Sequence, residues 1–174
     1  FDEASGTLAF NSGFLGAPAN GTYNATVSLG NPSLVPAFGF AAGFNNTNSS
    51  VAVPALGAYN QITIEVWAKP RSFGAAGPGN PHSGYNSIYT TDNYVPGALH
   101  THFINTFPNQ RWQLAINPSH TDIEAGNSGL FPSNTWVYLA ITHDSLARRT
   151  IAYVNGKAVL TNNNSTTVPV TLTA

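Results

Sequence analysis

The stretch Thr150-Ile-Ala-Tyr-Val-Asn155-Gly156-Lys-Ala-Val-Leu160 decides the fold. Two apolar runs flank the pair Asn155-Gly156, which is typical of a two-residue type I′ turn because both turn residues must take a positive φ. The twist of this turn matches the twist of the strands that it joins. The stretch therefore predicts a β-hairpin.

Two longer strands are expected before this hairpin. From Gln61 to Lys69, apolar and polar residues alternate with a period of two, which is typical of a strand with one buried face. Pro70 then ends the strand because it has no N–H for the ladder. The run Thr135 to His143 is apolar on both faces, as in a central strand of a sandwich. Shorter strands are expected at Gly21–Ala25, Phe38–Phe44, Ser50–Val53, Ser87–Thr91, Leu99–Ile104 and Arg111–Ile116.

The composition also favours strands and turns. Of the 174 residues only 7% are charged, against a usual share of about 25%. Solubility therefore depends on Asn, Thr, Ser and Gly, which are poor helix formers. Many short strands separated by turn residues predict an all-β, two-sheet antiparallel sandwich or jelly roll, in one domain over residues 1–174.

The charge pattern excludes two classes of partner. Six basic and seven acidic residues are scattered along the chain, giving a formal net charge of -1. Nucleic acids and anionic membrane surfaces both require clustered Lys and Arg. No run of about 18 apolar residues is present, so membrane insertion is not expected. The absence of Cys and Met suits an extracellular or surface-exposed setting, which is the expected location.

Several strings, taken in order, resemble a known family. Phe1-Asp-Glu-Ala-Ser-Gly-Thr7 is similar to the opening strand of laminin-G-like jelly rolls in the concanavalin A-like lectin and glucanase superfamily. Ile62-Thr-Ile-Glu-Val-Trp-Ala-Lys-Pro70 resembles that family's central strand. Trp136-Val-Tyr-Leu-Ala-Ile-Thr-His-Asp144, followed by Ile151-Ala-Tyr-Val-Asn-Gly-Lys157, resembles its signature pair of strands. The resemblance implies a laminin-G-like jelly roll and a non-catalytic recognition domain that binds glycans.

The chain departs from the family pattern in two places. It ends in Pro169-Val-Thr-Leu-Thr-Ala174, where the family has a further aromatic strand, so we expect the last strand to be missing. An open edge or terminus can then pair with a neighbouring chain. Asn11 stands where the family often has an acid near a structural calcium. Asp2 and Glu3 remain as the candidate calcium ligands, since calcium prefers oxygen donors.

Glycan recognition needs aromatic rings for the apolar faces of sugars and polar side chains for their hydroxyl groups. One region of the sequence combines both, and the tyrosines there are favoured over Trp67, Trp112 and Trp136, whose strand patterns are typical of a core. The candidate ligand-binding residues are Tyr85, Asn86, Tyr89, Asp92, Asn93, Tyr94, His100, His102, Asn109, Arg111 and Trp112.

Two other chemistries are less favoured. Asp122-Ile-Glu124 is the nearest match to the paired carboxylates of a glycoside hydrolase, but its flanking residues do not match. His100-Thr-His102 places two imidazoles on one strand face, yet zinc needs further ligands, and neither His82 nor His120 has a spacing that links it to them.

The resulting hypothesis is a non-catalytic carbohydrate-binding domain with no certain cofactor. The alternative is a structural or adhesive surface subunit that packs against other protein chains, and the second alternative is a glycoside hydrolase.

Overall fold

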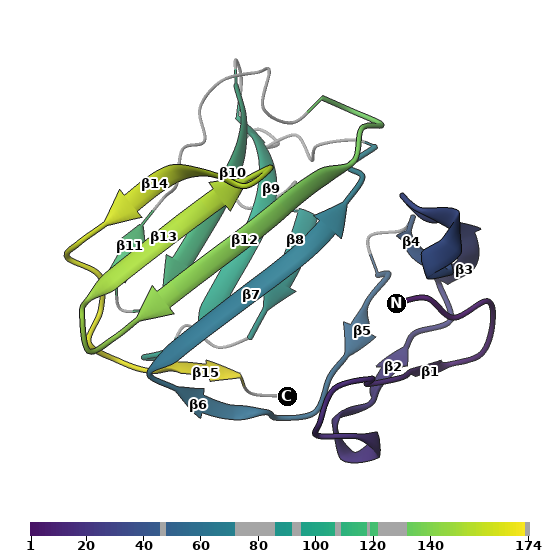
Figure 1. Cartoon of the computed structure of the whole chain (residues 1–174), viewed down its shortest axis with the longest axis horizontal. Helices are drawn as coiled ribbons and strands as arrows, with labels where there is room; N and C mark the ends of the chain where they lie inside the picture. Colours follow the sequence, from purple (N-terminus) through teal and green to yellow (C-terminus); the bar gives the residue numbers. More distant parts are fainter. Residues whose placement is uncertain are drawn as a thin grey trace. The chain divides into compact units, whose positions relative to one another are not determined.

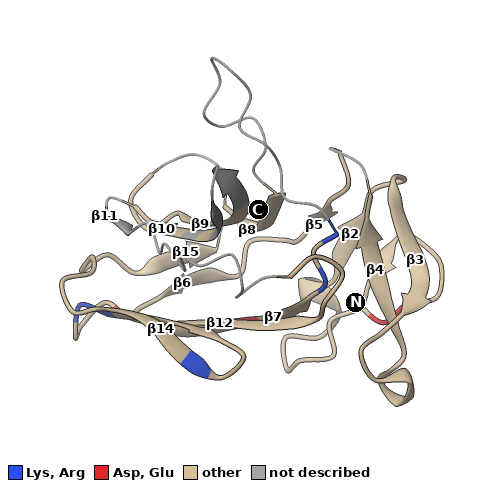
Figure 2. Ribbon diagram, turned by 90° about the horizontal axis from the view of Figure 1, so that it is seen from above, with Lys and Arg blue, Asp and Glu red and all other residues tan. Residues whose placement is uncertain are grey.

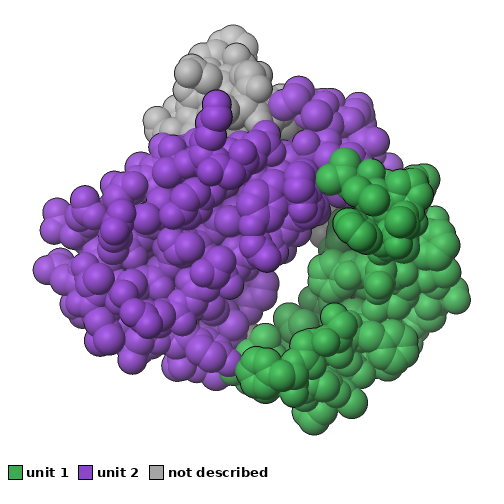
Figure 3. All heavy atoms as spheres, viewed as in Figure 1, with its two compact units in different colours: residues 1–56, 173–174 green, residues 57–172 purple. Residues whose placement is uncertain are grey.

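The computed structural model describes residues 1–45, 48–71, 86–91, 95–106, 109–117, 119–121 and 132–172. The chain divides into two compact units, residues 1–56 and residues 57–172, which are coloured separately in Figure 3. Each unit is described on its own below. The prediction of a single domain over residues 1–174, and of a missing last strand, stays a prediction.

The C-terminal unit contains a four-stranded antiparallel sheet in the order β14-β13-β12-β7 (Figure 1). It confirms both long strands that the sequence predicts, within two residues at each end. The bounds are β7 Gln61–Ala68, β12 Val137–Asp144, β13 Arg149–Val154 and β14 Lys157–Asn162.

The predicted hairpin joins β13 to β14. Asn155 has a φ of 49° and Gly156 a φ of 79°, as a type I′ turn requires. The pairing is antiparallel, with an irregularity in register at Ala152/Tyr153. The side chain of Asn155 also accepts a hydrogen bond from the Tyr138 N–H at 3.0 Å, so the turn is fixed to β12.

A second antiparallel sheet has the order β11-β10-β9-β8 and forms the other layer of the sandwich, as Figures 1 and 2 show. The short strands β6 and β15 pair with each other. Thr171 in β15 also donates its N–H to the Gly97 carbonyl at 2.9 Å, beside β9. The bounds are β6 Gly57–Tyr59, β8 Asn86–Thr90, β9 Leu99–Thr106, β10 Asn109–Ile116, β11 Ser119–Thr121 and β15 Val170–Leu172.

The core of this unit comes from the inner faces of the two layers. Alternate residues of β12 and β13 are buried, as expected for a strand period of two. In β9 and β10 the inner-face residues are buried as well, and so are His100 and Ala115 between them. The buried apolar side chains are Val137, Leu139, Ile141, Ala152 and Val154 on one sheet and Leu99, Phe103, Trp112, Leu114 and Ile116 on the other.

The N-terminal unit is built from very short elements. A three-stranded sheet has the order β1-β2-β5, and β3 pairs with β4 as a two-stranded ribbon. Two single-turn 3₁₀ helices, η1 and η2, each begin with a proline near the start. The bounds are β1 Leu8–Ala9, η1 Ala17–Ala19, β2 Gly21–Tyr23, β3 Val27–Pro32, η2 Pro36–Phe38, β4 Phe40–Phe44 and β5 Val51–Ala52.

Two sequence predictions need correction in this unit. The string Phe1 to Thr7 forms no strand, and the first ladder begins at Leu8. The strand predicted to begin at Phe38 begins at Phe40, because Pro36 has a fixed φ that suits the first turn of η2. In the part of the chain that the structure describes, no helix is long and apolar enough to cross a membrane.

Candidate functional site

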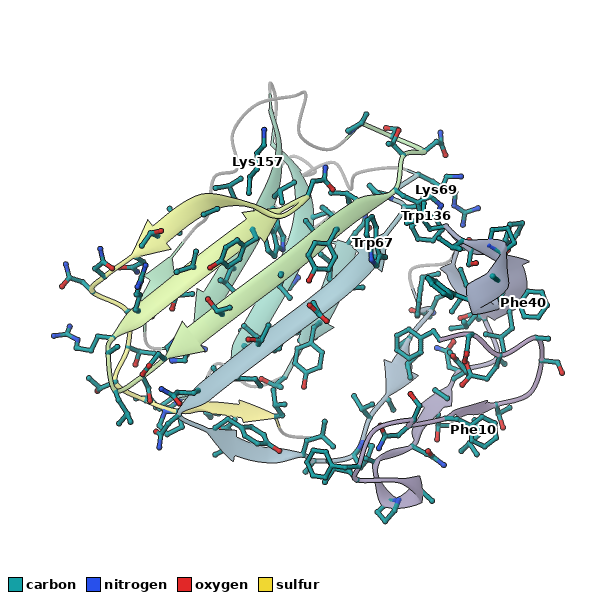
Figure 4. The ribbon with its side chains drawn as sticks, viewed as in Figure 1. Phe10, Phe40, Trp67, Lys69, Trp136 and Lys157 are labelled. Carbon is teal, nitrogen blue, oxygen red and sulfur yellow. The ribbon has the colours of Figure 1, made fainter. Side chains whose placement is uncertain are left out.

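The outer face of the β14-β13-β12-β7 sheet carries an exposed tryptophan. In β7 the side chains of Thr63, Glu65 and Trp67 point outward and are exposed, whereas the alternate apolar residues are half-buried. Trp67 is 52% exposed, which is unusual for so large an apolar side chain. Figure 4 places it toward the end of β7 that leads to Lys69.

Trp67 does not stand alone on this face. It lies opposite Tyr138 of β12 in the antiparallel register, and the two ring centroids are 5.2 Å apart at an interplanar angle of 44°. The Tyr138 hydroxyl donates a hydrogen bond to the Glu65 carboxylate. This bond to a carboxylate raises the pKa of Tyr138, so the phenol stays protonated. The contacts hold both rings in fixed positions.

Two further aromatic residues lie on the same face. Tyr153 of β13 is half-buried and lies opposite Ala140, whose other neighbour in the register is Glu65. Trp136 precedes Tyr138 by two residues and is half-buried. We call the four residues Trp67, Trp136, Tyr138 and Tyr153 the aromatic platform.

A depression of about 460 Å³, lined by both polar and apolar residues, lies at the other end of the same sheet. Asp144 is held there by two donors, the Gln61 side-chain amide at 2.7 Å and the Ala147 N–H at 2.8 Å. These hydrogen bonds lower the pKa of Asp144, the backbone N–H having the larger effect. The lining residues are Gln61, Ile62, Thr63, Thr142, His143, Asp144, Ala147, Arg149 and Ile151.

The two carboxylates described on this face, Glu65 and Asp144, lie far apart. Glu65 pairs in register with Ala140, and Asp144 lies four residues further along β12. At about 3.3 Å per residue this separates the two carboxylates by roughly 13 Å. Paired glycosidase carboxyls lie about 5 to 9.5 Å apart. Both carboxylates also accept hydrogen bonds from neighbouring side chains, which gives each a structural role.

The structure places the two predicted histidines on one face of β9, with their rings 6.1 Å apart. His100 is buried and its Nδ1 lies 2.8 Å from the Thr90 hydroxyl, while the Nδ1 of His102 lies 3.0 Å from the Ser87 hydroxyl. Among the described residues no group of three His, Cys, Asp or Glu could hold a metal ion. Each imidazole therefore forms a hydrogen bond with a hydroxyl group of the neighbouring strand β8.

The structure describes some of the other predicted binding residues. Trp112 is 1% exposed and donates its indole N–H to the Thr101 hydroxyl at 2.6 Å, so it is a core residue. Tyr89 lies opposite Thr101 and is half-buried, and Asn86 is exposed at the start of β8. Arg111 lies in β10 and His120 in β11. Tyr85, Asp92, Asn93, Tyr94, His82, Asp122 and Glu124 lie outside the described residues.

Glu3, a candidate calcium ligand, accepts two hydrogen bonds. Its Oε1 accepts the Phe10 N–H at 2.6 Å and its Oε2 accepts the Tyr23 hydroxyl. Burial alone would raise the pKa of Glu3, but these two hydrogen bonds lower it. The carboxylate thus anchors β2 through Tyr23, and the calcium role expected for Glu3 and Asp2 stays a prediction.

The sequence contained a signal for the aromatic platform. The apolar residues Ile62, Ile64 and Val66 lie on one face of the strand. Trp67 is one position out of step with them, so it lies on the polar face together with Thr63. A tryptophan on the polar face of an amphipathic strand is exposed unless another element covers that face. The prediction that Trp67 is a core residue did not take its position on the polar face into account.

Comparison with known proteins gives one family match. Residues 45–174 match a laminin-G family model described as the Concanavalin A-like lectin/glucanases superfamily. The match includes both long strands and the Asn155-Gly156 hairpin, and it begins well after the string at Phe1 to Thr7. A search of curated proteins found no match. Because the model covers well over half of the residues, the chain belongs to the concanavalin A-like lectin/glucanase superfamily.

Proposed function

We propose that this protein is a non-catalytic carbohydrate-binding domain and that glycans bind on the aromatic platform. The observation that carries the proposal is the ring pair in which Trp67, 52% exposed, lies 5.2 Å from the half-buried Tyr138. Sugar rings present apolar C–H faces, which pack on aromatic rings, while their hydroxyls need hydrogen-bonding partners.

Polar groups that suit sugar hydroxyls lie beside the rings. Glu65 and Thr63 are exposed on β7, and Thr142 lies opposite Thr63 on β12. The depression at the other end of the sheet adds the polar side chains of Asp144 and Arg149. A glycan chain that lies along β7 and β12 therefore meets aromatic groups at one end and polar groups at the other.

The lack of catalysis and the extracellular location are parts of the same proposal. The wide separation of Glu65 and Asp144 supports binding without hydrolysis. A surface with few charges and no oxidisable Cys or Met supports exposure outside the cell.

A glycan array on the purified protein, with and without excess chelator, tests the proposal and identifies a ligand. The affinity of Trp67→Ala for the best glycan is then measured by calorimetry, with Leu146→Ala as the matched control, since Leu146 is an exposed apolar residue away from the platform. We expect Trp67→Ala to raise Kd at least about tenfold, which corresponds to about 1.4 kcal/mol. We expect the control to leave Kd unchanged.

The proposal fails if a folded sample binds no glycan on the array, or if Trp67→Ala binds as tightly as the wild type. Binding that disappears with chelator would add a metal to the site. Release of a shortened product from the bound glycan would contradict the non-catalytic part of the proposal.

A further inference from the structure

The N-terminal unit exposes most of its large apolar side chains. Fourteen large hydrophobic residues are exposed among the described residues, and ten of them lie within residues 1–45. Its buried apolar residues in the described part are Ala9 and Tyr23. The ten exposed residues are Phe1, Leu8, Phe10, Phe14, Leu15, Leu34, Val35, Phe38, Phe40 and Phe44.

This surface also carries almost no charge. From Ala4 to Ile64 the sequence contains no Asp, Glu, Lys, Arg or His, and Asp2 and Glu3 are the only charged side chains in the first 56 residues. Figure 2 shows the strands of this unit without blue, with red near the N-terminus. Such a surface offers no partner for an ion pair beyond these two residues.

Part of the apolar surface is an ordered aromatic cluster. The Phe1 ring packs edge-on against Tyr23 at 5.8 Å and against Phe44 at 6.5 Å between centroids. Phe1 nevertheless remains 62% exposed and Phe44 48% exposed. The rings thus have defined positions, and their outer faces are available for contact.

We infer that the N-terminal unit, residues 1–56, is a self-association surface that binds the same unit of a second copy of this chain. A partner with charged groups would lose their hydration without gaining ion pairs here, which costs free energy. An equally uncharged surface avoids this cost, and interfaces between identical subunits are apolar and poor in charge at their centre. A two-fold pairing brings the same patch of both copies together.

The strands of this unit support the same inference. The ribbon of β3 and β4 has only two strands in the described part of the unit, and such a ribbon is marginally stable in water. Its backbone edges can pair with another strand. A second copy can therefore both cover the phenylalanines and extend the ribbon.

Analytical ultracentrifugation of the full chain over a range of concentrations tests the inference. We expect a reversible dimer. The variant Phe14→Ser/Phe38→Ser removes two side chains that are 98% and 77% exposed, and we expect its dimer Kd to rise at least tenfold. Leu146→Ser is the matched control, because Leu146 is 75% exposed but lies in the C-terminal unit, and we expect its dimer Kd to stay unchanged.

A folded wild type that stays monomeric at all concentrations would overturn the inference. An equal loss of association in Leu146→Ser would overturn it as well, because association would then be non-specific. Sedimentation of a monomeric wild type with neutral phosphatidylcholine vesicles would assign the surface to lipid instead. Circular dichroism checks that the variants fold. If the double variant does not fold, the single variant Phe14→Ser replaces it in the measurement. Glycan binding by monomeric variants separates this inference from the proposed function.

Discussion

Two glycines with similar backbones but different surroundings show how single positions constrain the fold. Gly97 has a φ of 88° and Gly156 a φ of 79°, both in the region that L side chains rarely adopt. A Cβ at Gly97 would lie 2.4 Å from the Pro169 carbonyl oxygen, whereas a Cβ at Gly156 would meet nothing within 4 Å. Gly97 is therefore needed for close contact between backbones as well as for its φ.

We expect Gly97→Ala to lower the free energy of unfolding by about 2–5 kcal/mol, through backbone strain and a steric clash. Gly156→Ala has only the strain and should cost about 1–2 kcal/mol. Urea denaturation of both variants checks this difference. Equal costs would mean that β15 moves away from Gly97 without loss of stability.

The site residues illustrate which properties the sequence can predict. The spacing of His100-Thr-His102 predicts correctly that the two histidines share one face of a strand, because the strand period is a local property. The burial of Trp112 and the contact of Trp67 with Tyr138 depend on how strands pair across the sheet. A local sequence pattern does not specify which strands pair with each other.

At the scale of elements, β12 and β7 differ in how much of their inner faces is covered. Ile141 of β12 and Ile64 of β7 lie opposite each other in the register. Ile141 is 4% exposed, whereas Ile64 is half-buried, because β12 has a paired strand on both sides and β7 ends the described sheet.

We expect Ile141→Ala to cost about 3–5 kcal/mol of stability, since it leaves a cavity in the core. Ile64→Ala should cost about half as much, because its side chain gives up less buried surface. Guanidinium denaturation of the two variants provides the test. A loss in Ile64→Ala as large as in Ile141→Ala would show that β7 is covered in solution.

Strong local signals predicted the elements of the C-terminal unit well. The Asn155-Gly156 turn and the alternation from Gln61 to Lys69 were each correct to within one or two residues. The strands β1, β6, β11 and β15, which have two or three residues each, were not predicted, because so few residues cannot display a period and their pairing depends on distant partners. The six-residue strand β3 was not predicted either, and its register with β4 is irregular between Ser28 and Asn31.

At the scale of the whole molecule, two histidines of the C-terminal unit should set the response to acid. Burial, with the nearby charge of His100, lowers the pKa of His102 to about 4, and burial lowers the pKa of His143. His143 Nδ1 lies 2.9 Å from the Thr150 hydroxyl, which lies 2.7 Å from that of Ser165. Both imidazoles are thus held neutral in the folded chain.

In the unfolded chain these histidines bind protons below about pH 6.5. The unfolded state then holds more protons than the folded state, so stability is complete above pH 6.5 and falls as the pH drops toward 4. Urea denaturation at pH 7.5, 6 and 5 measures this slope, and His102→Gln should make it shallower. A stability that does not change between pH 7.5 and 5 would contradict neutral burial.

The central claim is that glycans bind on the aromatic platform, and tryptophan fluorescence during titration with the best array glycan tests it most directly. Trp67 is 52% exposed and Trp112 is 1% exposed, so a ligand on the outer face of β7 changes the surroundings of Trp67 and leaves those of Trp112 unchanged. We predict a blue shift of the emission and protection from acrylamide quenching in the wild type, both lost in Trp67→Phe/Trp136→Phe, because both tryptophans belong to the platform. The same shift in this double variant, or saturable binding with no change in emission, would place the glycan elsewhere and contradict the claim.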